Sequence, residues 1–180
     1  MRMSSYDIII DAAEDVVMES GVSHLTLNAV VAKAGVSKGG LLHHFPSKNA
    51  LLRAMIERQT EVFDEARRQI LEELPKGPSC EPKSFIIALT NRSRDLDRLG
   101  VSLLAAVAHN PNLNEPIRKA LDKTYTKLAV TDTPFEKTIV MALAAQALWL
   151  QDILLLSPFT ERQSAEIIKE LLRLCDEVVR

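Results

Sequence analysis

The stretch Thr26–Lys48, TLNAVVAKAGVSKGGLLHHFPSK, is the part of the sequence that decides the fold. Thr26 is a good helix N-cap, and the apolar residues that follow it at helical spacing stop at Gly35, which suits the left-handed conformation that ends a helix. Ser37 caps a second short helix, and Pro46 stops it because the residue before a proline avoids the helical region. Two short helices joined by a tight turn with glycine are typical of a helix-turn-helix, whose second helix enters the DNA major groove.

Two adjacent glycines, Gly39 and Gly40, fall in the first turn of this second helix. Each costs about 0.5–1 kcal/mol relative to alanine, which is tolerable if the backbone must approach another surface closely. A DNA phosphate is such a surface, because the amides at a helix N-terminus attract anions. The alternative is a flexible loop followed by one helical turn. We favour DNA binding because the caps, the turn glycine, Lys38 and the stop occur in register.

Contacts to phosphate fix the position of a protein on DNA without reading sequence. We expect them from Thr26, Lys48 and the amides near Ser37 and Gly39. Lys38 is expected to reach a guanine edge or a phosphate, and Leu42 to meet a thymine methyl group. The adjacent His43 and His44 point about 100° apart on a helix, and neither has a further ligand at i+3 or i+4, so no metal site is expected.

This segment resembles the recognition region of TetR-family transcriptional regulators, which often reads close to V-S-K-G-x-L-Y-x-H-F-P-S-K-x-x-L. Here the chain has VSKGGLLHHFPSK over residues 36–48 and then Leu51. Beyond the first quarter to third of the chain, only length and helical architecture match. The resemblance implies DNA contacts at Ser37, Lys38, Gly39, Gly40, Leu42, His43, His44 and Lys48. Leu42 and His43 stand where many relatives carry tyrosine, and Gly40 where many carry threonine or asparagine, so base specificity does not transfer from any relative.

The composition is that of an ordinary globular chain of 180 residues, with 47% hydrophobic and 26% charged residues and few strand patterns. Its net charge is −2, so DNA binding has to come from a local basic patch. We expect that patch to comprise Lys33, Lys38, Lys48, Arg53 and the histidines His24, His43 and His44. No secretory signal is present, and Cys80 and Cys175 lack metal-ligand spacing, so we expect a cytoplasmic protein with two free thiols and no cofactor.

Apolar residues at helical spacing predict an all-α chain of about nine helices. The expected helices run from Ser4 to Gly21 and over residues 26–34, 38–45, 48–74, 83–97, 99–109, 115–130, 134–156 and 161–179. Start signals for the last two are Thr133-Pro134 with Glu136, and Thr160 with Gln163. We expect a three-helix DNA-binding domain at residues 1–48 and a helical effector-binding and dimerisation domain at 49–180. The long helix 48–74 bridges the two, and residues 75–82 form a loop.

The helix 134–156 is apolar on nearly every face, which indicates either deep burial or a membrane. Gln146, Gln151 and Asp152 interrupt it, so a core-plus-interface helix fits better than a membrane span. With the last helix it predicts a two-fold four-helix interface in a homodimer. The alternative is a monomer in which both helices fill the core. Expected interface residues are Leu148, Leu155, Ile167, Ile168, Leu171, Leu172, Cys175 and Val178.

The family resemblance also implies a small-molecule cavity among the central helices, for an apolar or aromatic effector. Its expected lining residues are Phe85, Leu89, Leu103, Leu104, Val107, Met141, Ala145 and Trp149, with Gln146 or Asp152 as polar anchors. Each of these residues has plain core packing as its alternative role. We therefore expect a ligand-responsive repressor that binds a palindromic operator as a homodimer. The alternative is an all-α dimeric ligand- or protein-binding module that has lost specific DNA reading. No Ser-His-Asp arrangement or phosphate-cradling glycine loop occurs, so an enzyme is not expected.

Overall fold

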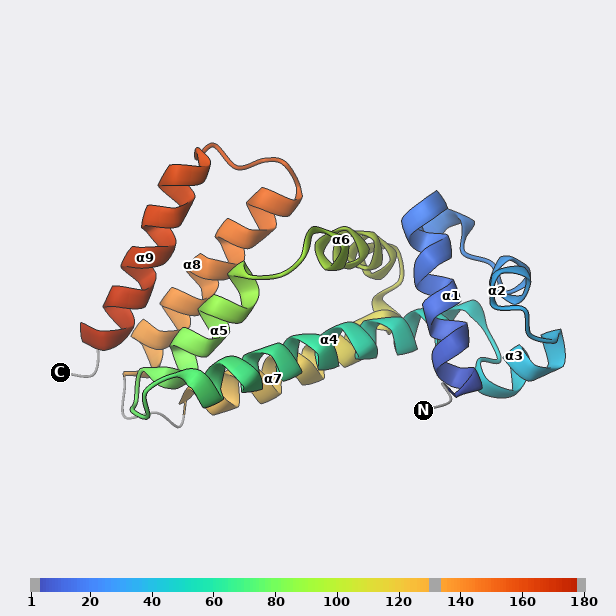
Figure 1. The fold of residues 1–180 in the computed structure, drawn as a ribbon, viewed down its shortest axis with the longest axis horizontal. Helices are drawn as coiled ribbons and strands as arrows, with labels where there is room; N and C mark the ends of the chain where they lie inside the picture. The colour runs from blue at the N-terminus through green and yellow to red at the C-terminus, as the bar shows by residue number, and fades with distance from the viewer. Residues whose placement is uncertain (1–3, 130–133, 178–180) are drawn as a thin grey trace. The chain divides into compact units, whose positions relative to one another are not determined.

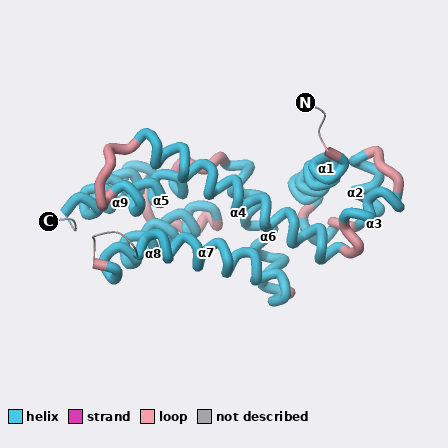
Figure 2. Tube along the Cα trace, turned by 90° about the horizontal axis from the view of Figure 1, so that it is seen from below, coloured by secondary structure: helices cyan, strands magenta, loops and turns pink. Residues whose placement is uncertain are grey.

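The computed structural model describes residues 4–129 and 134–177, and these contain nine α-helices, two short 3-10 helices and no strand (Figures 1 and 2). The prediction of an all-α chain is therefore confirmed. The α-helices are α1 Ser5–Ser20, α2 Leu27–Ala34, α3 Lys38–His44, α4 Lys48–Glu73, α5 Cys80–Thr90, α6 Arg94–His109, α7 Asn114–Ala129, α8 Phe135–Ile153 and α9 Glu161–Glu177. The 3-10 helices are η1 Val22–His24 and η2 Pro111–Leu113.

The helix ends near the N-terminus form where the local sequence predicts them. Thr26 accepts a hydrogen bond from the Ala29 amide at 3.1 Å, and Ser37 accepts one from the Gly40 amide at 3.0 Å. Gly35 ends α2 with φ 66°, a left-handed conformation that disfavours any side chain with a Cβ. These caps satisfy backbone amides that a helix start otherwise leaves without partners, so the helix-turn-helix boundaries are set locally.

The chain divides into two compact units. The first comprises Met1–Thr60 and Arg94–Arg118, and the second comprises Glu61–Ser93 and Lys119–Arg180. The chain therefore passes from one unit to the other within α4 and again within α7. These packing units do not coincide with the predicted functional domains 1–48 and 49–180, and the functional boundary stays a prediction.

The core of the first unit joins the helix-turn-helix to α1, α4 and α6. Its fully buried side chains include Ile9 and Ile10 from α1, Leu41 from α3 and Met55 from α4. Leu99 and Leu103 of α6 belong to the same cluster, so α6 is part of the unit that carries α3.

The core of the second unit is built from α5, α8 and α9, which lie side by side in Figure 1, together with α7. Phe85 and Ile86 of α5 are buried against Met141 of α8 and Leu171 of α9. Phe63 of α4 packs edge-on against Phe85, with 5.6 Å between ring centroids. The faces of α8 and α9 that pack into this apolar cluster are buried, and their remaining faces are exposed.

The predicted bounds of three helices are wrong. The helices expected over 83–97 and 99–109 are α5 Cys80–Thr90 and α6 Arg94–His109, with the break at residues 91–93. Proline at position 82 does not prevent an earlier start, because the first turn of a helix has no intrahelical partner for its amides. The helix expected over 134–156 ends at Ile153, and Leu155 adopts a positive φ of 56°. The predicted cap Thr133 lies outside the described residues.

Adjacent leucines on α3 offer a matched test of the packing. Leu41 is fully buried and Leu42 is 39% exposed. Leu41→Ala should lower the free energy of unfolding by about 2–5 kcal/mol, because it removes buried methyl groups and leaves a cavity. Leu42→Ala should change it by less than about 0.5 kcal/mol. Urea unfolding followed by circular dichroism measures both, and equal destabilisation by the two variants would contradict this packing of α3.

Candidate functional site

The helix α3 has one buried face and one broad exposed face. Leu41 and the following Phe45 are buried in the first unit. The remaining residues of α3, all exposed, are Lys38, Gly39, Gly40, Leu42, His43 and His44. The structure therefore exposes six of the nine residues predicted to contact DNA along one seven-residue helix, with Ser37 exposed at its start.

The two glycines of α3 differ in what surrounds them. A Cβ built on Gly39 would have no other atom within 4 Å, so internal packing does not require glycine there. A Cβ on Gly40 would lie 3.2 Å from the hydroxyl oxygen of Ser37, the group that caps α3. A side chain at position 40 would therefore crowd the cap, a contact that the sequence does not reveal, while Gly39 leaves the backbone open to an external surface.

Most of the expected basic patch is occupied by contacts within the chain. Lys33 forms an ion pair with Glu19 at 2.5 Å, and Arg53 forms one with Glu115 at 2.5 Å. The half-buried Lys48 donates a hydrogen bond to the carbonyl oxygen of Val22 at 3.1 Å, which joins the start of α4 to η1.

Lys38, in contrast to Lys33 and Arg53, is not occupied by such a contact within the described part of the chain. It is exposed and makes no ion pair with any residue in the described ranges 4–129 and 134–177. Its ammonium group is therefore available to an external anion.

An aromatic cluster positions the C-terminal end of α3. The Tyr6 ring of α1 lies 5.0 Å from Phe45 and 6.1 Å, edge-on, from His44, measured between ring centroids. His44 thus packs against Tyr6 while it remains exposed. Tyr6 is a positioning residue that the sequence analysis did not single out.

The helix α1 is also held by an ion pair to α4. Arg58 lies 2.5 Å from a carboxylate oxygen of Asp11 and 3.6 Å from one of Glu14. Burial raises the pKa of Glu14, and the nearby positive charge of Arg58 lowers it by less, so the pKa stays above its ordinary value. This contact fixes α1, against which α2 packs, to the first half of α4.

The residues expected to line an effector cavity divide between the two units. Phe85, Leu89, Met141 and Ala145 are buried together in the second unit, with the half-buried Trp149 beside them. Leu103 and Val107 of α6 belong to the first unit's core, and Leu104 is 38% exposed. Gln146 accepts a hydrogen bond from the Tyr125 hydroxyl at 3.0 Å, whereas Asp152 is exposed. The structure does not bring the α6 residues into the cluster with the others.

The residues expected at a dimer interface also divide. Leu148, Leu171 and Cys175 are buried inside the chain, so they have little surface left for a partner. Ile167, Ile168 and Leu172 are half-buried, Leu155 is 93% exposed, and Val178 lies outside the described residues. The open apolar face of α8 instead carries Val140, Leu143 and Leu150, with exposed Ala144 and Ala147 between them. Sequence periodicity could not select this face, because α8 is apolar all round.

Within residues 4–129 and 134–177, no three histidine, cysteine, aspartate or glutamate side chains are placed to hold a metal ion. None of the helices in these ranges combines the length and the apolar character needed to cross a membrane.

Comparison with known proteins points to one family. The family model for bacterial regulatory proteins of the tetR family matches residues 9–55. The model for the tetracyclin repressor-like C-terminal domain matches residues 81–176, more than half of the chain.

Individual relatives agree with these matches. The chain is 33% identical over 79 residues to the HTH-type transcriptional regulator BetI of Klebsiella pneumoniae, over 44% of this chain but only 40% of BetI. It is 24% identical over 191 residues to the HTH-type transcriptional repressor KstR of Rhodococcus jostii, over 95% of this chain and 80% of KstR. The structure of the multidrug binding protein EbrR complexed with imidazole has the same fold, with a TM-score of 0.71, 22% identity and coverage of 94% and 96% of the two chains. EbrR is also known in complexes with ethidium and proflavin.

The two thiols should differ in reactivity. Cys175 is fully buried, and burial raises its pKa to about 11, whereas Cys80 is half-exposed at the start of α5. Because the thiolate is the reactive form, we expect one thiol per folded chain to react with Ellman's reagent at pH 8, and two in urea. Cys80→Ser should abolish the reaction of the folded chain and Cys175→Ser should leave it intact. Rapid modification of Cys175 in the folded Cys80→Ser protein would contradict its burial.

Proposed function

Because the chain belongs to the TetR family of bacterial transcriptional regulators, we propose that it is a cytoplasmic repressor that binds an inverted-repeat operator as a homodimer. Members of this family are DNA-binding regulators and not enzymes. A small, largely apolar effector releases the protein from DNA. The observation that carries the proposal is the exposed face of α3. This face includes Lys38, which has no ion pair among the described residues, and the buried Leu41 holds the helix in place.

The proposed DNA contacts follow the surface of α3. The amides at its start and the Lys38 ammonium group bind phosphate or a guanine edge, and Leu42 and His43 lie against base edges in the major groove. Thr26 and Ser37 bind phosphate through oxygen atoms that already cap α2 and α3, since a hydroxyl group can also donate. His44 and Lys48 contribute at the edges of the surface while keeping their contacts to Tyr6 and Val22.

Dimerisation is proposed through α8 and α9. Val140 is 65% exposed and Leu143 is 49% exposed, and they continue at helical spacing to Ala147 and Leu150. An apolar stripe of this kind is typical of a self-complementary two-fold interface. Two recognition helices related by such an axis read half-sites about 34–36 Å apart, or a multiple of that distance.

The effector is proposed to bind in the second unit, near the buried cluster of Phe85, Leu89, Met141 and Ala145, with Trp149 and Gln146 at its edge. Support comes from EbrR, which shares the fold and is known with imidazole, ethidium and proflavin. The helix α4 runs through both units, so a displacement of its second half is passed to the first unit, which carries α3. The effector releases DNA only if it binds the released conformation more tightly than the DNA-bound one.

The test of the whole proposal is selection of bound sequences from random duplex DNA by the purified protein, repeated at several salt concentrations. Enrichment of an inverted repeat supports a dimeric sequence reader. Weak binding that enriches nothing and vanishes with salt indicates purely electrostatic association, and would favour a binding module that has lost DNA reading.

Lys38 and Lys33 form a matched pair for this interface. Lys38→Ala should lower operator affinity, because it removes a charge that has no ion pair among the described residues. If Lys38 binds phosphate, the loss is similar for all sequences, and the slope of log affinity against log salt falls by about 1. If it reads guanine, the free-energy difference between the preferred base and other bases at one operator position falls by about 1–3 kcal/mol. Lys33→Ala should change neither quantity, because Lys33 is paired with Glu19. Unchanged affinity for the Lys38 variant, measured by fluorescence anisotropy, would remove Lys38 from the interface.

The dimer is tested by Leu143→Glu. A carboxylate placed in the apolar stripe of α8 would have to be buried without a partner, so the variant should be monomeric at micromolar concentration while keeping its helical circular dichroism spectrum. Val62→Glu on α4, where the valine is 37% exposed, is the control and should remain dimeric. Sedimentation velocity distinguishes the two states. A dimeric Leu143→Glu protein would exclude this face as the interface.

A further inference from the structure

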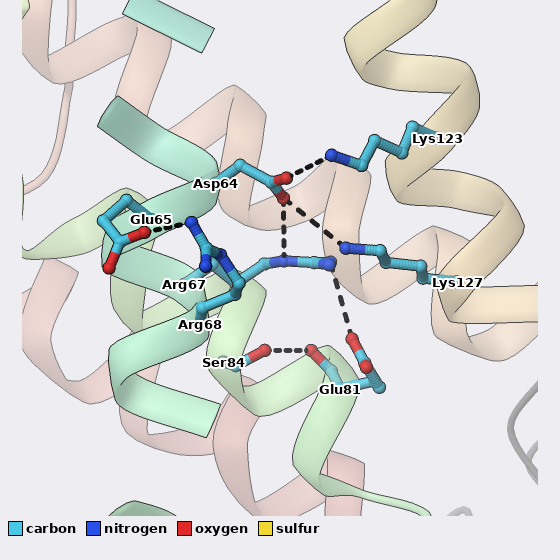
Figure 3. A network of polar contacts seen from close by, with 8 residues as sticks. All are labelled: Asp64, Glu65, Arg67, Arg68, Glu81, Ser84, Lys123 and Lys127. Carbon is cyan, nitrogen blue, oxygen red and sulfur yellow. Dashed lines mark hydrogen bonds and ion pairs between the residues drawn. The ribbon is translucent and has the colours of Figure 1, made fainter. Parts of the chain in front are cut away.

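One charged side chain lies in the interior of the second unit. Arg67 of α4 is 1% exposed, the largest fully buried side chain of the described residues, and it lies close to the junction of α4, α5 and α7 (Figure 3). Its neighbour Arg68 is exposed and pairs with Glu65, as a surface arginine usually does. A buried guanidinium has five N–H donors that need acceptors, so the surroundings of Arg67 require an explanation.

The carboxylates beside Arg67 do not meet this need. Its Nε lies 3.8 Å from Asp64 and its Nη1 lies 3.5 Å from Glu81, distances of ion pairs and not of hydrogen bonds. Neither nitrogen has a hydrogen-bond partner among the described residues, and the same is true of Oε2 of Glu81. Nε and Nη1 of the guanidinium are therefore held by charge without a hydrogen-bond acceptor among the described residues.

Asp64 is shared with two further cations. It accepts a hydrogen bond from Lys123 at 2.5 Å and lies 3.7 Å from Lys127 (Figure 3). Burial raises the pKa of Asp64, but the hydrogen bond from Lys123 and the charges of Lys127, Lys123 and Arg67 together lower it below its ordinary value. Asp64 is thus ionised at neutral pH. Three cations therefore face two carboxylates, although the Lys123 side chain is 61% exposed and the Lys127 side chain 36%.

We propose that the effector is a carboxylic acid with an apolar body, and that Arg67 binds its carboxylate, with one oxygen accepting a hydrogen bond from a nitrogen that lacks a partner. A carboxylate is a planar, negatively charged acceptor that suits a guanidinium, and it would supply an acceptor to a nitrogen that lacks one. The inference rests on the proposed effector function and narrows it to one chemical class.

Apolar side chains next to Arg67 suit the rest of such a ligand. Phe63 lies one helical turn before Arg67 on α4 and contacts Phe85 of α5 edge-on. Phe85 belongs to the same buried cluster as Leu89 and Met141. A charged head beside Arg67 and an apolar body toward this cluster give the pattern usual in ligand sites, which are mostly apolar with a few placed polar groups. Buried water, which also provides acceptors, is the competing explanation for the nitrogens, and it adds no charge.

The test follows the Nε–Hε resonance of Arg67 by nitrogen-15 NMR in the 180-residue chain, with Arg67→Lys used to assign it. Sodium acetate, benzoate and octanoate are titrated at constant ionic strength, with acetamide, benzamide and octanamide as uncharged counterparts. We expect a saturable shift with the carboxylates only. Arg67→Lys keeps the charge but loses the planar guanidinium, and should weaken binding by about 10- to 100-fold. Because this variant lacks the Arg67 resonance, the affinities of all variants are compared by isothermal titration calorimetry. Arg68→Gln is the matched control and should bind like the wild type.

Three results would overturn the proposal. They are a folded wild-type protein whose Arg67 resonance responds to no carboxylate, an equal response to the amides, and unchanged affinity in Arg67→Lys. Acetate has no apolar body, so a failure of acetate to bind could not be explained by an apolar body of the wrong size or shape.

Operator binding measured with the same probes separates this inference from the proposed function. Carboxylate-dependent loss of the DNA complex in wild type and Arg68→Gln, weakened in Arg67→Lys, supports both. Release by an uncharged compound without any carboxylate binding keeps the proposed function and overturns the inference. Carboxylate binding at Arg67 that leaves operator affinity unchanged overturns the role of the acid as effector.

Discussion

The exposed face of α3 depends on the burial of Leu41 and Phe45. A helix of seven residues is far too short to be stable alone in water, because its first turn fixes several dihedral angles for one hydrogen bond. Two glycines near its start weaken it further. What holds it is the apolar contact of Leu41 and Phe45 with the core of α1, α2 and α4, together with the Ser37 cap. Two buried side chains thus leave the rest of the helix free for another molecule.

The fold was largely predictable where local sequence determines it. Caps such as Thr26 and Ser37 act on amides two or three residues away, so a short window of sequence contains both partners. The break at residues 91–93 was not found, because no proline or glycine marks it and apolar residues continue on both sides. The open face of α8 was missed for a related reason: periodicity identifies an inward face only when the other faces are polar.

The site was less predictable than the fold, because its charges are decided by contacts between distant parts of the chain. Lys33, Lys38 and Arg53 look equivalent in the sequence. In the structure, Lys33 meets Glu19 from another helix and Arg53 meets Glu115, 62 residues away, while Lys38 keeps an unpaired ammonium group among the described residues. The same reasoning divides the predicted effector residues, since Leu103 of α6 packs in the unit that contains α3 and Phe85 packs in the other.

Arg67 shows most clearly what only the three-dimensional structure can reveal. At the sequence level it is one of two adjacent arginines on the polar side of a long helix, and nothing distinguishes it from Arg68. Burial costs a guanidinium several kcal/mol that ion pairs at 3.5–3.8 Å only partly offset, and apolar residues of similar size often replace buried ion pairs without loss of stability. The contact of Phe63 with Phe85 already joins α4 to α5 without any charge. Buried water would account for the missing partners of Arg67 but not for the burial of its charge, whereas a bound anion accounts for both.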